Sequence, residues 1–222
     1  MQHSEASEAN PATMRIGTVA ALWRYPIKSL GAEPLAQVDV LDDGIAGDRA
    51  AAVMIESDHA RMGKPLRGKE SNRLHLVRGA TEAAGVAAGL GIKVRLAEGG
   101  RHFDARPISL VFDTWIAEAE VLLGRKLDPL RYRPNIVAHA AEGFVLKESA
   151  LVGRSITIGD VRLTVTEEID RCVTTTYDVQ TGESDMNVLR VVAQYRDNVM
   201  GVYCKVTRTG TIPVGAAINL EN

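Results

Sequence analysis

The stretch SITIGDVRLTVTE, residues 155–167, indicates the fold class most clearly. Two short runs of alternating apolar and polar residues, 155–158 and 161–167, are rich in Val, Ile and Thr, as pleated strands are. The pair Gly159-Asp160 between them is typical of a tight two-residue β-turn. This stretch therefore predicts an antiparallel hairpin.

Similar apolar, β-branched runs, bounded by Gly, Pro, Asp or Asn, occur on both sides of this hairpin. Together they favour a mainly β (α+β) protein built on a barrel or sandwich. The further strands predicted are 14–24, 35–41, 49–56, 74–78, 92–97, 135–139, 173–177, 199–207 and 211–214.

Only a few helices are expected beside this sheet. Asp113 can cap one helix that ends before Gly124, and Asp185 can cap another that carries Leu189 and Val192. The Ala-rich stretch 81–90 is a third candidate, although two internal glycines weaken it.

The chain of 222 residues is long enough for two closely packed subdomains. Residues 1–13 have no periodic pattern and are predicted to be a disordered tail. A break near Arg106-Pro107 divides the rest into a smaller N-terminal β subdomain, 14–106, and a larger domain, 107–222.

Charge and composition argue against several function classes. With 26 basic and 28 acidic residues the net charge is −2, so no overall field favours nucleic acid or an anionic membrane. No apolar run approaches the roughly 20 residues needed to span a bilayer, and we expect a cytoplasmic protein. The two cysteines are too few for an iron–sulfur cluster, so electrons would come from a partner.

One cysteine stands in a segment that suits metal chemistry. Cys172 follows Arg171 and precedes a run of threonines at a predicted strand start. A guanidinium nearby favours the thiolate, the form that ligates metals. Taken alone, however, this segment favours a buried structural cysteine, and Cys204, within a predicted strand, is expected to pack in the core.

Three loops place cationic side chains beside backbone breaks. They contain Lys28-Ser29 after Pro26, Arg49 after Gly47-Asp48, and Arg131, Arg133 and Asn135 around Pro134. The guanidinium fork matches phosphate oxygens, so converging loops of this kind could bind a phosphate. The alternative is that Arg49 pairs with Asp48, that Arg131 is a surface charge and that Lys28 pairs with nothing.

Several familiar motifs are missing. The sequence has no Gly-x-Gly-x-x-Gly, no phosphate loop and no His-Glu-x-x-His pair, which argues against nucleotide-binding folds and zinc proteases. The histidines lack ligand spacing, and Asp178 is expected to serve a turn.

Taken together, the motifs resemble the MOSC-domain family in their order and approximate spacing. The segments that carry this resemblance are YPIKS (25–29), GDR (47–49), RYRPNIV (131–137), RCVTT (171–175), GVY (201–203) and GTIPVG (210–215). The family is named after the C-terminal domain of molybdenum cofactor sulfurases and includes the mitochondrial amidoxime-reducing component. The resemblance implies a MOSC-type β-barrel with a smaller N-terminal β subdomain and a few peripheral helices.

The resemblance also implies a molybdenum-pterin cofactor. In the family pattern Cys172 matches the cysteine that ligates molybdenum, and it is therefore the expected catalytic and metal-binding residue. The residues expected to bind the pterin and its phosphate are Lys28, Ser29, Arg49, Arg133, Asn135 and Arg171. No pyridoxal phosphate is expected, because the chain has no room for the sulfurase domain that binds it.

The expected activity is reduction of N-hydroxylated or related N-oxygenated compounds by oxo transfer, with electrons from a separate flavin or iron–sulfur protein. The expected partners are thus this donor and a small-molecule substrate, with no nucleic acid and no membrane. Between Arg49 and Pro107 the chain is shorter than the amidoxime-reducing members, so the substrate stays open. The alternatives are a non-catalytic carrier of the cofactor or its sulfur, and a barrel that binds no cofactor.

Overall fold

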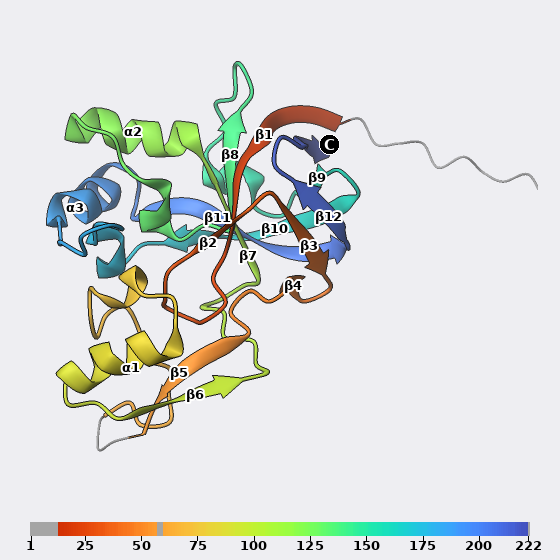
Figure 1. Ribbon diagram of the computed structural model, residues 1–222. Coiled ribbons are helices and arrows are strands. Elements are labelled where there is room, and N and C mark those ends of the chain that lie inside the picture. The colour runs from red at the N-terminus through yellow and green to blue at the C-terminus, as the bar shows by residue number, and fades with distance from the viewer. Residues whose placement is uncertain (1–12, 57–59, 222) are drawn as a thin grey trace, which may run out of the picture.

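The computed structural model describes residues 13–56 and 60–221, and its centre is a closed seven-stranded β-barrel (Figure 1). The strands, in hydrogen-bonding order, are β13 (Ala217–Glu221), β9 (Ser155–Ile158), β10 (Val161–Asp170), β11 (Val199–Arg208), β7 (Ile108–Phe112), β8 (Ile136–Ala140) and β1 (Thr13–Arg24). The pairing of β1 with β13 closes the barrel, and β7 and β8 run parallel.

The predicted hairpin forms the β9–β10 pair, with Val161 opposite Ile158 across the turn. Its buried side chains alternate, and Val161, Leu163 and Val165 all point into the barrel core. This alternation follows from the two-residue period of a pleated strand, which places every second side chain on one face.

Shorter strands flank the barrel. Strand β2 (Glu33–Leu35) extends the main sheet beside β1, while β12 (Gly210–Pro213), β3 (Gln37–Leu41) and β4 (Gly44–Ile45) form a three-stranded sheet. Val38, Val40 and Ile212 from this small sheet belong to the barrel's hydrophobic core, so the two sheets pack together.

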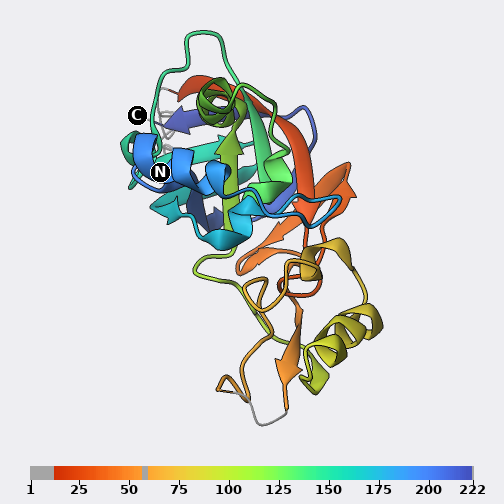
Figure 2. The same cartoon turned by 90° about the vertical axis from the view of Figure 1, so that its left-hand side faces the viewer.

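A second unit, here called the small lobe, projects from one end of the barrel (Figure 2). It consists of β5 (Ala51–Ile55), β6 (Val94–Glu98), the 3-10 turn η1 (Leu74–Leu76) and helix α1 (Ala80–Gly89). Val53, Ile55, Leu74 and Ala83 are buried in its own hydrophobic cluster, which is separate from the barrel core.

Two helices cover one side of the barrel, α2 (Asp113–Leu123) and α3 (Met186–Tyr195). As predicted, Asp185 caps α3, since its Oδ1 accepts the N–H of Asn187 at 2.9 Å. Asp113 is the first residue of α2 rather than its cap, and its carboxylate accepts N–H bonds from Thr114 and Ala140. The predicted C-terminal Gly124 has a left-handed φ of 67°.

The mainly β fold with a barrel is confirmed, and the Ala-rich segment does form a helix, α1. Two strand predictions are wrong. Residues 74–76 and 173–176 are the 3-10 turns η1 and η4 (Val173–Thr176), in which local turn hydrogen bonds replace a strand ladder. Strand β7 was not predicted, because all five of its residues are buried and show no alternation.

The predicted tail, 1–13, lies outside the described residues except for Thr13, which begins β1. The boundary near Arg106-Pro107 stays a prediction, although β1, from the N-terminal side of that boundary, is part of the barrel. No helix within 13–56 and 60–221 is long and apolar enough to cross a membrane.

Candidate active site

A cavity of about 340 Å³ lies where the barrel end meets the small lobe. Its size falls in the range of about 300–1,000 Å³ that is usual for small-molecule sites. It is formed by the end of β10, turn η4, turn η2 (Pro129–Tyr132), and loops around Ser29, Arg49 and Gly68. Five of the seven predicted site residues line it: Ser29, Arg49, Arg133, Arg171 and Cys172.

Cys172 is half-buried in this cavity at the start of η4. Its Sγ lies 3.2 Å from the Thr174 hydroxyl, and its carbonyl accepts the N–H of Thr175 at 2.9 Å. A Cβ on Gly68 would lie 2.9 Å from Thr174 Cγ2, so the small-lobe loop passes directly beside the cysteine segment. Cys204 is fully buried in the barrel core, as predicted.

Arg171 holds this end of the barrel together. Its guanidinium donates to the carbonyls of Tyr132, at 2.8 Å, and Met200, while its own carbonyl accepts from Asn198. No carboxylate within the described chain pairs with it, and burial lowers the pKa of Arg171.

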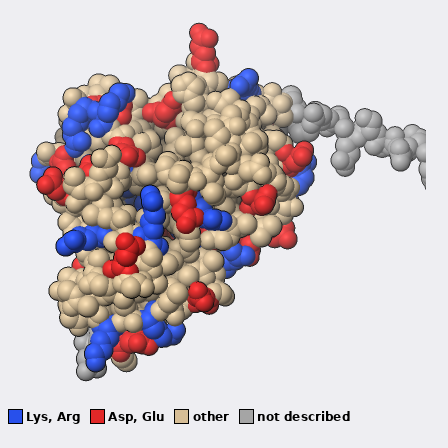
Figure 3. All heavy atoms as spheres, in the orientation of Figure 1, with Lys and Arg blue, Asp and Glu red and all other residues tan. Residues whose placement is uncertain are grey.

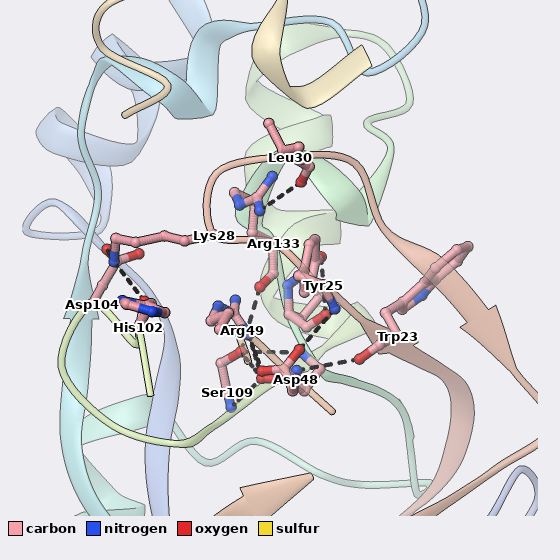
Figure 4. Close-up of polar contacts among 12 residues, drawn as sticks. Trp23, Tyr25, Lys28, Leu30, Asp48, Arg49, His102, Asp104, Ser109 and Arg133 are labelled. Atoms are coloured by element: carbon pink, nitrogen blue, oxygen red, sulfur yellow. Dashed lines mark hydrogen bonds and ion pairs between the residues drawn. The ribbon is translucent and has the colours of Figure 1, made fainter. Parts of the chain in front are cut away.

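Arg49 lies at the centre of a buried polar cluster (Figure 4). It forms an ion pair with the fully buried Asp48 and lies 3.4 Å from Asn135 Oδ1. Asp48 also accepts the N–H of Tyr25 at 2.7 Å, which connects the two motif loops. Burial by itself would lower the pKa of Arg49, but the adjacent Asp48 carboxylate raises it.

Arg133 and Arg49 share one aromatic partner. Their guanidinium carbons lie 4.3 and 4.5 Å from the ring centroid of Tyr25. Arg133 also donates to the carbonyl of Leu30 at 2.8 Å but pairs with no carboxylate of the described residues. Burial and then the nearby Arg49 lower the pKa of Arg133, although Tyr25 counteracts them. An anion in the cavity would therefore relieve two adjacent cations.

The other two predicted residues, Lys28 and Asn135, do not line the cavity. Lys28 Nζ donates to the His102 carbonyl at 2.8 Å and pairs with Asp104, which does line the cavity (Figure 4). Asn135 is 1% exposed and binds Ser109, the Trp23 carbonyl and Arg49. Both side chains therefore contact residues of the cavity wall.

The backbone around the cavity is unusual. Ser29, Arg49 and Arg133 have left-handed φ angles of 70°, 48° and 50°, which cost energy in residues with a Cβ. The other two non-glycine residues of this kind in the described chain are Asp197 and Asn198, and Asn198 binds the backbone of Arg171. Such strain gathers at functional sites.

The cavity is cationic. In the described part of the chain, six cations and two carboxylates line it: Arg49, Arg67, Lys69, Arg131, Arg133 and Arg171 against Asp104 and Asp170. On the face drawn in Figure 3, basic and acidic side chains lie next to each other in the narrow region between the barrel and the small lobe. No group of three His, Cys, Asp or Glu suited to a metal occurs among the described residues.

Several lining residues were not among the expected site residues. Arg131 is not a surface charge, since it is 6% exposed and donates to Asp178 at 2.7 Å and to the Thr176 carbonyl. His75 stacks on Tyr177, with ring centroids 5.8 Å apart, and both line the cavity. The position of Arg131 in RYRPNIV was a usable signal, whereas nothing in the sequence links 75 with 177.

Two expectations from the sequence have mixed outcomes here. The alternative interpretation of Arg49 as a partner of Asp48 is correct, yet the same guanidinium lines the cavity. Asp178 does serve a turn, accepting N–H bonds from Gln180 and Thr181.

Comparison with protein families agrees with this arrangement. The family model "MOSC domain" matches residues 97–219, more than half of the chain. The chain belongs to the MOSC domain family. A second model, "MOSC N-terminal beta barrel domain", matches residues 16–104. Membership associates the chain with the molybdenum cofactor, which MOSC domains are known to use.

One solved structure shares the fold at low identity, and a second aligns over most of the chain. The YuaD protein from Bacillus subtilis aligns over 96% of this chain and 99% of its own, with 17% identity and a TM-score of 0.58. YiiM from Escherichia coli aligns over 94% and 70%, with 12% identity and a TM-score of 0.48. No curated protein matches the sequence.

Proposed function

We propose that this MOSC protein binds a molybdenum-pterin cofactor in the cationic cavity and uses it to reduce N-hydroxylated or related N-oxygenated compounds. The observation that carries the proposal is the position of Cys172. Its thiol shares one cavity with Arg133 and Arg171, two guanidinium groups that lack carboxylate partners in the described chain. A thiol suited to a metal and cations suited to an anion thus lie on one cavity.

The residues present fit such a cofactor. A soft thiolate is a suitable ligand for a metal already held by dithiolene sulfurs. The phosphate of the pterin carries negative charge, which Arg49 and Arg133 would bind, with the Ser29 hydroxyl available as a further donor. Three of the six lining cations, Arg49, Arg67 and Arg131, are paired with carboxylates behind the wall. Arg133 and Arg171 have no such partner among the described residues and leave room for that charge.

The remaining predicted residues would act from behind this wall. Lys28 would restrain Asp104, and Asn135 would fix Arg49 through Oδ1. Arg171 would hold turn η2 and strand β11 together beside Cys172, because its guanidinium donates to the Tyr132 and Met200 carbonyls.

When bound, the cofactor would supply two-electron redox chemistry with transfer of one oxygen atom. For an N-hydroxylated compound the balance is R–NH–OH + 2 H⁺ + 2 e⁻ → R–NH₂ + H₂O. The electrons would come from a separate reduced flavin or iron–sulfur protein. The chain's own part is to orient the cofactor, exclude bulk water and hold the thiol.

Metal content after purification from a molybdenum-replete host tests the ligand. The wild type should contain close to one molybdenum per chain, and Cys172→Ala should contain almost none. Cys204→Ala is the matched control, because that thiol is buried in the barrel core and should not affect metal content. Equal molybdenum in the wild type and Cys172→Ala would refute the assignment of the ligand.

Turnover separates an enzyme from a carrier. The wild-type protein that contains the cofactor, reduced with dithionite, should convert an N-hydroxylated compound to its amine. Two electrons should be consumed for each amine formed. Protein that contains the cofactor but fails to turn over any N-oxygenated compound would identify a carrier and contradict the reductase proposal.

A further inference from the structure

We propose that a second cavity beside the first binds an aromatic acid, so that the substrate class of the proposed reductase is an aromatic N-oxygenated compound that carries an acidic group. That the ligand is a substrate rests on the proposed function. The cavity and the kind of ligand that suits it do not depend on the cofactor.

The second cavity has a volume of about 240 Å³. It shares His75, Leu130, Arg133 and Val179 with the first cavity. A ligand here would therefore lie directly next to one in the cavity of Cys172. Its remaining lining residues are Trp23, Tyr25, Gly31, Ala32, Pro34, Leu76 and Arg78.

One side of the cavity is flat and apolar. Trp23 on β1 is the direct cross-strand partner of Pro34 on β2. Directly opposed residues of an antiparallel pair project to the same face of the sheet, so the indole and the pyrrolidine ring lie side by side. The Trp23 backbone is fixed by Asn135, whose carbonyl accepts its N–H at 2.8 Å. This surface suits stacking of a planar ring.

The charge of the cavity has one sign. Arg78 and Arg133 line it, and no Asp or Glu among the described residues does. Neither guanidinium has a carboxylate partner among the described residues. Arg133 is shared with the first cavity, where it would bind the phosphate of the cofactor, so Arg78 is the cation left for a ligand here. The Arg78 stem is held close to the backbone of Gly31, where a Cβ would lie 3.1 Å from Arg78 Cγ. Cations around a flat apolar surface favour an aromatic ring with an anionic substituent.

The size of the cavity is suited to a single substituted ring. An apolar protein cavity of about 150 Å³ binds benzene. The 240 Å³ found here is thus large enough for a six-membered ring together with a carboxylate. His75 would face such a ligand in its uncharged form, because burial lowers its pKa.

Benzoate is a direct probe, with benzamide and cyclohexanecarboxylate as its uncharged and non-aromatic counterparts. Binding to the full-length protein is measured by calorimetry and by tryptophan emission. The chain has two tryptophans, and Trp115 is buried in the barrel core, so a change on binding reports Trp23. In Trp23→Phe the emission change should vanish while calorimetry still detects benzoate.

Charge selectivity is tested with paired arginine variants. Arg78→Gln should weaken benzoate binding about tenfold, the usual effect of losing one charge-assisted contact. Arg73→Gln is the matched control, since Arg73 is exposed on the same lobe and lines neither cavity. Benzamide and cyclohexanecarboxylate should each bind at least about tenfold more weakly than benzoate.

The inference is overturned if benzoate fails to bind at millimolar concentration, if cyclohexanecarboxylate binds equally well, or if Arg78→Gln has no effect. The measurements are made on protein from molybdenum-replete and molybdenum-depleted cultures in parallel. If benzoate binds but neither preparation contains molybdenum, only the cofactor proposal is contradicted. Molybdenum without benzoate binding would remove only the second site.

Discussion

The guanidinium carbon of Arg133 lies 4.3 Å from the ring centroid of Tyr25, with Arg49 4.5 Å from the same centroid. One tyrosine ring therefore supports two cations, of which only Arg49 has a carboxylate partner among the described residues. The arrangement is costly without a ligand, because like charges are held together in a buried position. It is useful to a protein that must bind an anion.

Arg133 should matter more for ligand binding than for stability. Arg133→Gln removes a cation without a carboxylate partner and loses a bond to one carbonyl, that of Leu30, so the free energy of unfolding should fall by no more than about 1 kcal/mol. Arg171→Gln removes the same charge but breaks contacts to the Tyr132 and Met200 carbonyls, and should cost about 1–3 kcal/mol. Urea unfolding checks stability, and bound molybdenum, expected to fall in both variants, checks binding. Equal destabilisation by the two substitutions would contradict this division of roles.

The two thiols should differ in accessibility. Cys172 lines an open cavity, whereas Cys204 is fully buried, and burial raises the pKa of Cys204 to about 12. Ellman's reagent should therefore modify one thiol in the native, cofactor-free protein and both in guanidinium chloride. Mass spectrometry should locate the native modification on Cys172, and loading with cofactor should protect it. Modification of Cys204 in the native state would show that the barrel core opens.

The buried tyrosines should make the fold sensitive to alkali. Burial raises the pKa of Tyr25 and of Tyr132 to about 12, against 10.0 for an ordinary tyrosine. Between these values the folded chain keeps protons that the unfolded chain has lost, so this stability is complete below about pH 10 and is lost as the pH rises toward 12.

Phenylalanine variants test this prediction. Tyr25→Phe loses the bond from its hydroxyl to the Pro134 carbonyl, and should cost about 1 kcal/mol at pH 8. The Tyr132 hydroxyl has no partner in the described residues, so Tyr132→Phe should be nearly neutral there. Unfolding free energies measured from pH 8 to above pH 10 should decline less steeply in both variants. Curves parallel to the wild type would contradict the prediction.

Glycine replacements should separate a close contact from an open helix position. Gly68→Ala would bring a Cβ to within 2.9 Å of Thr174 Cγ2, and the loop must shift away from the Cys172 segment. We expect a loss of about 1–2 kcal/mol and faster modification of Cys172. Gly85→Ala is the control, because a Cβ at this helical position meets nothing within 4 Å, and it should stabilise α1 by about 0.5–1 kcal/mol. Thermal unfolding and thiol kinetics measure both effects.

Most of the barrel could be predicted from local sequence, because alternating β-branched residues and a Gly-Asp turn determine a hairpin without help from distant contacts. The failures at 74–78 and 173–177 are alike. Both segments are β-branched or apolar enough for a strand, but each forms a 3-10 turn with residues that line the cavity. Strand β7 was not predicted, because all of its residues are buried and its sequence does not alternate between apolar and polar residues.

By itself, the sequence determined the strand-rich architecture, the family and a set of candidate anion-binding residues, since these depend on residue type and spacing. Only the tertiary structure decided which of them meet. It places Cys172, Ser29, Arg49, Arg133 and Arg171 on one cavity and Lys28 and Asn135 behind its wall. It also brings Trp23 and Pro34 beside Arg78. The physical reason is that side chains distant in sequence converge only when the barrel closes and the small lobe packs against its end.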